Sequence, residues 1–255
     1  YLANNLRRFI PDRLAYFLIR IRNISFQQFF FKRARAYPEQ AKERILNMVK
    51  EELPEDIVNK HFTPSYNPWD QRICLIPNSD FFESIKAKTS SVVTDHIEKF
   101  EEKGIRLKSG NFLPADLIVT ATGLILESFG GVKMSVDNKP IEASDTYTYR
   151  SLMYSGIPNL VSCFGYINAS WTLKADLTSE YVCRLIKHMK KNDFEVVCPQ
   201  FEVDIEESDD FLNGFSSGYI KRAADSQPKQ GKEKPWINLQ DYFKDWIDIK
   251  FKKLD

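Results

Sequence analysis

The apolar side chains of this chain recur at helical spacing in three stretches. Over residues 4–22, 39–52 and 173–190, apolar positions lie three or four residues apart, with charged residues between them. That spacing places the apolar side chains on one face of a helix. Pro11 suits a first helical turn, so a break near it is compatible with the first stretch. We predict three amphipathic helices, of which 173–190 has the clearest pattern.

Shorter apolar runs between the second and third helices predict strands. The runs 91–95, 105–108 and 116–121 are separated by turn residues at 103–104 and 109–111. Glycine and asparagine at those turn positions favour a tight reversal of the chain. We expect the three runs to form an antiparallel meander.

The remaining segments give weaker signals. Residues 61–80 are rich in Pro, Asn and Asp, which favour loops, and 81–86 suits a short helix. The runs 149–153 and 160–164 are further strand candidates. From Asp204 onward, an acidic stretch precedes a Lys- and Gln-rich stretch and then several aromatic residues. We predict that this tail is an extended arm that packs late over the rest of the protein.

The run 116–123, Asp-Leu-Ile-Val-Thr-Ala-Thr-Gly, is the most informative short segment. Its branched apolar residues are typical of a strand in a covered sheet. The run ends at Thr122 and Gly123, and glycine lets the backbone approach a ligand or another segment closely. Taken alone, the octapeptide favours an ordinary core strand with a tight turn. The surrounding motifs decide whether a ligand lies at its end.

Charge is distributed unevenly along the chain. The net charge is +1, but residues 1–50 carry a net +8 and the remainder a net −7. A basic region suits nucleic acid, anionic lipid or a phosphorylated cofactor, although most charges on a helix simply face water. Basic and aromatic residues do not interleave here, so no nucleic-acid partner is predicted. A peripheral membrane contact by a basic helix is the alternative to packing against protein.

The cysteines and histidines do not suggest a metal site. Four cysteines are scattered without C-x-x-C spacing, and three histidines lie far apart. Neither a zinc cluster nor a redox dithiol is predicted. No apolar run approaches the ~20 residues that span a bilayer. Free thiols favour a cytoplasmic location, with membrane association as the alternative.

Several motifs occur in an order that resembles the flavin-containing and Baeyer–Villiger monooxygenases. The run 116–123 is similar to the Asp-x-Ile-Val-x-Ala-Thr-Gly motif of flavoenzymes with two dinucleotide domains, and Gly156–Leu160 is similar to Gly-x-Pro-Asn-Leu. Further segments resemble one branch of the group, that of the ethionamide-activating FAD monooxygenase. These segments are 61–64, 67–72 (Asn-Pro-Trp-Asp-Gln-Arg), 91–97 and 170–181.

The resemblance implies an α/β fold, namely the C-terminal part of a Rossmann-like flavoprotein with two dinucleotide-binding domains. Residues 1–115 would be the remainder of an NADPH-binding domain with a helical insertion. Residues 116–200 would be the C-terminal part of an FAD-binding domain, and 201–255 a C-terminal arm. Such enzymes hold a pyrophosphate on Gly-rich turns, but this chain has no G-x-G-x-x-G. We expect those turns to lie before residue 1, and the chain alone to bind FAD weakly or not at all and to be inactive.

The resemblance also implies site residues. Arg72 corresponds to an arginine that stabilises the anionic oxygenated flavin, because a guanidinium stays charged and donates several hydrogen bonds. An ordinary surface or ion-paired arginine is the alternative. Thr122 and Gly123 would lie near the junction of the nucleotide domains. The start of the 173–190 helix would direct its positive end at the flavin pyrimidine edge, with an ordinary capped helix as the alternative. The cofactor-binding residues there would be Asn168, Ser170, Trp171, Thr172 and Leu173.

The predicted function is therefore an FAD- and NADPH-dependent monooxygenase. NADPH would reduce the flavin, and molecular oxygen would add to give a peroxyflavin that oxygenates a ketone or oxidises a sulfur or nitrogen centre. The predicted substrate is a small apolar ketone or thioether. Two alternatives stay open: a flavin-dependent NADPH oxidoreductase without oxygenation, and a non-catalytic basic binding module.

Overall fold

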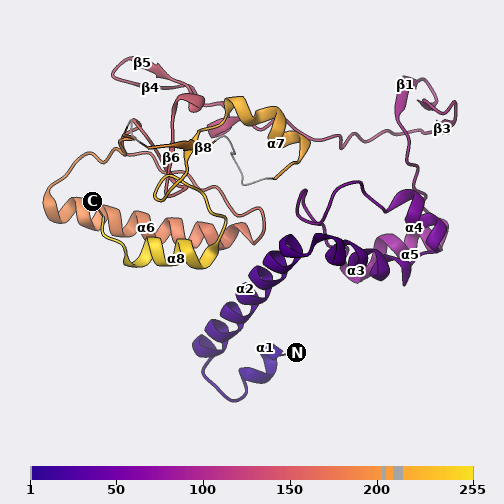
Figure 1. The fold of residues 1–255 in the computed structure, drawn as a ribbon, viewed down its shortest axis with the longest axis horizontal. Coiled ribbons are helices and arrows are strands. Elements are labelled where there is room, and N and C mark those ends of the chain that lie inside the picture. The colour runs from indigo at the N-terminus through magenta and orange to yellow at the C-terminus, as the bar shows by residue number, and fades with distance from the viewer. Residues whose placement is uncertain (1, 203–204, 209–214, 255) are drawn as a thin grey trace. The chain divides into compact units, whose positions relative to one another are not determined.

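The structure is a computed structural model, and it describes residues 2–202, 205–208 and 215–254. The chain forms two compact units, one of residues 1–36 with 125–255 and one of residues 37–124. Each unit contains both helices and strands (Figure 1). The mixed α and β content confirms the coarse prediction of fold class.

The first unit begins with two helices separated by Pro11. They are α1 (Leu2–Leu6) and α2 (Asp12–Ala36). The break near Pro11 is confirmed, but α2 continues well beyond the predicted end at residue 22. No Gly or Pro interrupts the sequence from Asp12 to Ala36, so nothing in it stops the helix earlier. Pro38 then disfavours the helical conformation at Tyr37.

The second unit has a helical part with a small core. Its helices are α3 (Pro38–Lys50), α4 (Glu55–His61), the 3-10 turn η1 (Pro77–Ser79) and α5 (Asp80–Lys86). Leu53, Val58 and Phe82 are buried together where these elements meet. The predicted helices 39–52 and 81–86 are confirmed. Helix α4 was not predicted, because its seven residues are too few to show a helical period.

A three-stranded sheet follows in the same unit. Strands β1 (Ile97–Glu101), β2 (Gly104–Leu107) and β3 (Phe112–Pro114) pair antiparallel in the order β1-β2-β3. The antiparallel meander and the turns at 103–104 and 109–111 are confirmed, but only the second strand was placed correctly, because the first was predicted at 91–95 and the third at 116–121. At Gly104 a Cβ would lie 2.0 Å from the Leu113 carbonyl oxygen, so the tight turn requires glycine.

The run 116–121 is not a strand, and this prediction was wrong. It is extended chain, and Leu117 and Val119 are each 81% exposed. A strand forms only where a neighbour accepts and donates its backbone hydrogen bonds. Within the described residues, no strand pairs with this run. Gly123, two residues after the run, has φ +101, a backbone conformation that favours glycine.

The strands of the first unit are short antiparallel pairs. They are β4 (Met134–Val136) with β5 (Lys139–Ile141), β6 (Thr148–Tyr149) with β7 (Met153–Tyr154), and β8 (Glu207–Ser208) with β9 (Gln230–Gly231). The predicted strand 149–153 is in fact the turn of a hairpin, because Arg150 and Ser151 have positive φ and reverse the chain. The prediction of a strand at 160–164 was also wrong.

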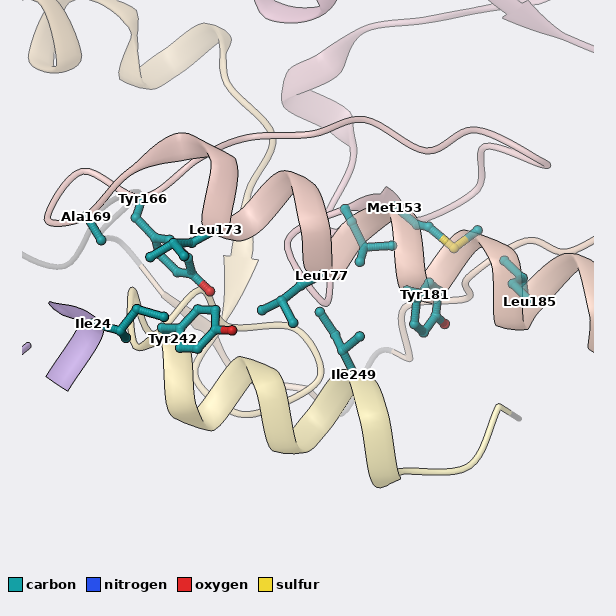
Figure 2. Packing of buried hydrophobic residues seen from close by; sticks show 11 residues of the cluster. Ile24, Met153, Tyr166, Ala169, Leu173, Leu177, Tyr181, Leu185, Tyr242 and Ile249 are labelled. Atoms are coloured by element: carbon teal, nitrogen blue, oxygen red, sulfur yellow. The ribbon is translucent and has the colours of Figure 1, made fainter. Parts of the chain in front are cut away.

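The main core lies between two helices of the first unit. Helix α6 (Trp171–Asn192) packs against α8 (Tyr242–Phe251), and the shorter α7 (Gly218–Ala223) lies between them in sequence. Figure 2 shows Leu177 and Tyr181 of α6 on the side that faces Tyr242 and Ile249 of α8, with Ile24 of α2 at one end of the cluster.

The predicted helix 173–190 is confirmed as α6, but the tail is not simply an extended arm. Helix α8 belongs to the main core, because its apolar face is the surface that covers α6. Its buried face carries Asp245 and Asp248 beside Tyr242 and Ile249, so the apolar side chains of 242–251 show no clear helical period. Part of the predicted acidic stretch, residues 204 and 209–214, lies outside the described residues.

Candidate functional site

The N-terminus of α6 is the first part of the candidate site. Ser170 is the N-cap residue, yet its side chain accepts no hydrogen bond from the helix. Its hydroxyl instead lies 2.8 Å from the Thr172 hydroxyl. The N–H groups of a first helical turn have no partner within the helix, and the helix dipole makes this end positive. The Leu173 N–H donates to the Ser170 backbone oxygen at 3.2 Å. The backbone donors that the start of α6 offers to an electron-rich acceptor are therefore the N–H groups of Trp171 and Thr172.

Glycine shapes the loop that leads into α6. A Cβ at Gly165 would lie 2.2 Å from Cγ of Trp171, so only glycine allows the Trp171 ring to lie back over the loop. The ring also contacts Phe164, with 5.5 Å between ring centroids. Trp171 is still 48% exposed, so one part of the indole faces outward beside the helix start.

Asn168 is the most deeply buried of the predicted cofactor-binding residues. It is 1% exposed, and its Nδ2 donates to the backbone oxygen of Gln240 at 2.8 Å. Its Oδ1 has no hydrogen-bond partner among the described residues. A buried amide oxygen without a donor is costly, so this atom suits a ligand that brings an N–H group.

A pocket of about 290 Å³ adjoins the start of α6. Ser170 and Leu173 line it from one side, and Tyr16, Arg20 and Ile24 line it from α2. Most of the exposed lining surface is apolar, and two cations, Arg7 and Arg20, also line the pocket. The pocket lies entirely within the first unit, so the structure defines its walls.

Arg20 ties α2 to the first turns of α6. Its guanidinium donates to Asp176 Oδ2 at 2.5 Å and to the Tyr16 hydroxyl at 3.1 Å. Burial alone would lower the pKa of Arg20, but hydrogen bonds to Tyr16 and Asp176 outweigh it and raise that pKa above its ordinary value. Arg20 therefore stays a cation at any working pH.

Arg72 extends from an ordered turn in the second unit. The backbone N–H of Asn67 donates to Asp70 Oδ2 at 3.1 Å, and the N–H of Asp70 donates to the Asn67 oxygen at 3.1 Å. Trp69 occupies the turn with φ +69. The turn ends at Gln71, and the next residue, Arg72, is exposed.

The predicted site residues fall into two groups. Arg72, Thr122 and Gly123 are exposed and lie in the unit of residues 37–124, whereas the α6 group lies in the other unit. Within the α6 group the residues do lie together, with Asn168 and Leu173 buried and Ser170, Trp171 and Thr172 exposed. A shared role for the two groups stays a prediction.

The sequence reasoning missed the residues that hold this site in place. Asp245 of α8, 5% exposed, accepts from Lys174 and from the Tyr166 hydroxyl, each at 2.9 Å. Burial, followed by the nearby Asp245 carboxylate, raises the pKa of Tyr166 above its ordinary value, so this hydroxyl remains a donor. Lys174 lies three residues before Leu177, on the apolar side of the helix, which marks it as a buried cation but does not identify its partner.

No group of His, Cys, Asp or Glu side chains in the described ranges could hold a metal ion. Among the helices that the structure describes, none has the length and apolar character needed to cross a membrane.

The residues at the start of α6 fit a flavin. The pyrimidine edge of a flavin presents carbonyl acceptors beside an N–H donor. The uncapped helix start offers donors for the carbonyl groups, and the orphan Oδ1 of Asn168 offers an acceptor for the N–H group.

Comparison with known proteins gives relatives over the whole chain. The chain is 43% identical over 255 residues to the "Probable FAD-binding monooxygenase AlmA" of an Acinetobacter species, covering 100% of this chain and 51% of that protein. It is 44% identical over 254 residues to the "FAD-containing monooxygenase EthA" of Mycolicibacterium smegmatis, covering 99% and 51%. It is 44% identical over 256 residues to the protein of that name from Mycobacterium tuberculosis, covering 100% and 52%.

The chain spans about half the length of the curated relatives it matches, and the matched part is their C-terminal half. No family model and no solved structure matches the chain.

Proposed function

Because this chain is homologous to the C-terminal half of the FAD-containing monooxygenases, we propose that it forms the corresponding half of an FAD- and NADPH-dependent monooxygenase. The proposed reaction is a Baeyer–Villiger oxygenation of a ketone, or oxidation of a sulfur or nitrogen centre. The observation that carries this proposal is the identity of 40–44%, which extends over the whole chain rather than over one motif.

The start of α6 supplies the proposed contact with the cofactor. Bound FAD, reduced by NADPH, supplies the electrons that activate molecular oxygen. The free N–H groups of the first turn after Ser170 would donate to the flavin pyrimidine edge, where negative charge accumulates on reduction. Asn168 Oδ1 would accept the N–H of the same edge.

Arg72 supplies the proposed charge stabilisation. Its side chain is exposed on a turn fixed by the hydrogen bonds between Asn67 and Asp70. A guanidinium in that position would donate to negative charge that develops on oxygen during the reaction. Thr122 and Gly123 would place backbone near the junction of the two nucleotide domains.

The exposed run 116–121 supports the proposal that the chain needs the first half of such an enzyme. Leu117 and Val119 are each 81% exposed although their sequence is typical of a covered strand. An added strand from another polypeptide segment would pair its backbone and bury these side chains. The chain alone would then be inactive.

The substrate and the location are also proposals. The apolar pocket beside Ser170 and Leu173 suits a small apolar ketone or thioether. The four cysteines are all free, which supports a cytoplasmic location. Exposed Phe26 and Phe29 beside Arg22 on α2 keep a peripheral membrane contact as the alternative.

The test combines this chain with the first half of the Mycolicibacterium smegmatis relative, co-expressed as a two-part assembly. We expect the assembly to copurify with FAD and to oxidise NADPH with formation of an oxygenated product from a cyclic ketone or a thioether. The control is Val119→Asp, which changes an exposed residue of the isolated chain and should block assembly. An assembly that forms but holds no FAD would contradict the proposal.

Arg72→Ala in the assembly separates oxygenation from simple reduction. We expect NADPH oxidation to continue with hydrogen peroxide release, while product falls by about 100-fold or more, the usual cost of losing a donor to a developing oxyanion. Arg72→Lys is the matched control that keeps the charge but loses the planar donor set. If the unmodified assembly releases only peroxide, the alternative of a flavin-dependent NADPH oxidoreductase without oxygenation is correct.

A further inference from the structure

The C-terminal residues 240–245 hold the loop before α6 by several buried contacts. Gln240 is 5% exposed, and its Oε1 accepts from the backbone N–H of Ile167 at 2.9 Å. Its backbone oxygen accepts from Asn168 Nδ2 at 2.8 Å. Two adjacent loop residues are thus bound to a single residue of the C-terminal segment, more than 70 positions later in the chain.

The carboxylate of Asp245 contacts residues on both sides of the predicted site. Its Oδ2 accepts from the hydroxyl of Tyr166, before the loop, and from Nζ of Lys174, in the first turn of α6, both at 2.9 Å. Its Oδ1 lies 3.3 Å from Nζ of Lys234. One carboxylate therefore fixes both ends of the segment that contains Asn168 and Ser170.

The buried ion pair of Asp245 with Lys174 is not expected to add much to the stability of the fold. The Lys174 side chain is 2% exposed and that of Asp245 is 7% exposed, so both charges lose nearly all their hydration. Well-packed apolar side chains often stabilise such a position equally well. Hydrogen bonds between charged groups also fix the relative orientation of the two side chains, and an apolar pair does not.

We infer that Asp245 is a positioning residue that sets the orientation of the flavin-facing end of α6. The inference rests on the proposed function, because it takes the helix start to face the cofactor. By fixing Tyr166 and Lys174 at once, Asp245 aims the free N–H groups after Ser170 and holds Asn168 Oδ1 beside them. The C-terminal segment 240–245 then supports the cofactor site without touching the cofactor.

Asp248 provides a matched control on the same helix. It lies one turn after Asp245, is 4% exposed, and binds Arg150 of the β6–β7 hairpin at 2.9 Å. Asp245→Asn and Asp248→Asn each remove one buried carboxylate charge from α8 next to a cation. We expect only the first to loosen the loop before α6, because Asp248 reaches that region only through Arg150, whose backbone oxygen lies 3.5 Å from Nζ of Lys174. A merely structural role predicts similar effects of both variants.

The first experiment uses the 255-residue chain without any flavin. Hydrogen exchange measured by mass spectrometry should show amides of residues 165–173 exchanging about tenfold faster in Asp245→Asn, since this removes the charge that holds both ends of the loop. Asp248→Asn should leave that segment unchanged. Tyr166→Phe, which removes a single hydroxyl, is the milder variant if Asp245→Asn fails to fold. Equal exchange at 165–173 in the Asp245 and Asp248 variants would overturn the inference.

The second experiment uses the two-part assembly loaded with FAD. Asp245→Asn should shift the flavin absorbance bands and the reduction potential, and Asp248→Asn should not; Asp245→Glu should restore part of the shift. If exchange rises at 165–173 but neither flavin signal moves, the positioning role is wrong while the proposed function stands. If the unmodified assembly binds no FAD, the proposed function fails and the inference fails with it.

Discussion

Helices α6 and α8 pack against each other, but their N-termini are built differently. At the start of α8, Asp241 Oδ1 accepts from the backbone N–H groups of Phe243 and Lys244 at 3.1 and 3.3 Å. Asp241 Oδ2 also binds Nζ of Lys32 at 2.9 Å. At the start of α6, Ser170 makes no such bond. The start of α8 is therefore closed, meaning that a capping side chain occupies its backbone donors, and the start of α6 is open, meaning that Ser170 does not cap it.

An open start does not by itself mark a binding site, because α3, α4 and α7 also lack a side-chain cap. The contrast with α8 shows that no cap occupies the donors at the start of α6. A capping side chain stabilises a helix because it satisfies donors that the helix cannot. It also occupies those donors, so a helix start that binds a ligand cannot keep such a cap. The uncapped start of α6 is tolerated because the long helix is held by its packed face, which includes Leu177 and Tyr181.

The largest expected effect comes from opening the start of α8. Asp241→Ala removes the cap and the Lys32 ion pair, and should lower the free energy of unfolding of the chain by about 1–2 kcal/mol. Ser170→Ala should change it by less than about 0.5 kcal/mol, because no cap is lost. Urea denaturation of the two variants, followed by far-UV circular dichroism, measures both. Equal losses would mean that α6 is capped after all and would remove the contrast.

Much of the fold follows from the sequence where the partners of a segment lie nearby or on a long face. Helix α6 was predicted because its 22 residues present several turns of one apolar face. The β1–β3 meander was predicted because Gly104 and the turn at 109–111 force local reversals. In both cases the information lies within one short stretch of chain.

The sequence was misleading where a segment depends on distant residues. The run 116–121 has the composition of a buried strand, but composition does not supply the neighbouring strand that Leu117 and Val119 require. The contacts of Asp245 with Tyr166 and Lys174 were missed for a related reason. They join residues 71 and 79 positions apart, and no local pattern marks which buried charges will meet.

The same sequence predicted part of the candidate site. The loop before α6 was identified by resemblance, and the structure brings Asn168, Ser170 and Leu173 together there. Gln240 and Asp245, which hold that loop, lie in the tail predicted to be an extended arm. The buried face of α8 includes two aspartates, Asp245 and Asp248, so its apolar period is weak and its role could not be predicted.

Lowering the pH should reduce the stability that Asp241 gives to the start of α8, by less than Asp241→Ala does. Burial alone would raise the pKa of Asp241, but the hydrogen bond from Lys32 and those from the backbone outweigh it and lower that pKa below its ordinary 3.8. A lowered pKa means that the folded state binds this proton less readily than the unfolded state does. The resulting stability is present above about pH 4 and is lost as the pH falls through the lowered pKa of the folded chain. Urea denaturation between pH 3 and 6 should show a weaker acid dependence in Asp241→Asn than in the unmodified chain, and identical slopes would contradict this assignment.

Closing the start of α6 should stabilise the chain slightly, and it tests the contrast with α8 most directly. Ser170→Asp places a carboxylate at the positive end of the helix, which should raise the free energy of unfolding by about 0.3–1 kcal/mol. The same carboxylate would compete for the donors that the flavin pyrimidine edge is proposed to use, so FAD affinity of the two-part assembly should fall even as the chain becomes more stable. Ser170→Asn introduces a neutral capping side chain. It is the matched control that separates the effect of occupying the backbone donors from the effect of adding a negative charge. A stabilised chain that binds FAD as tightly as before would show that the open helix start faces something other than the cofactor.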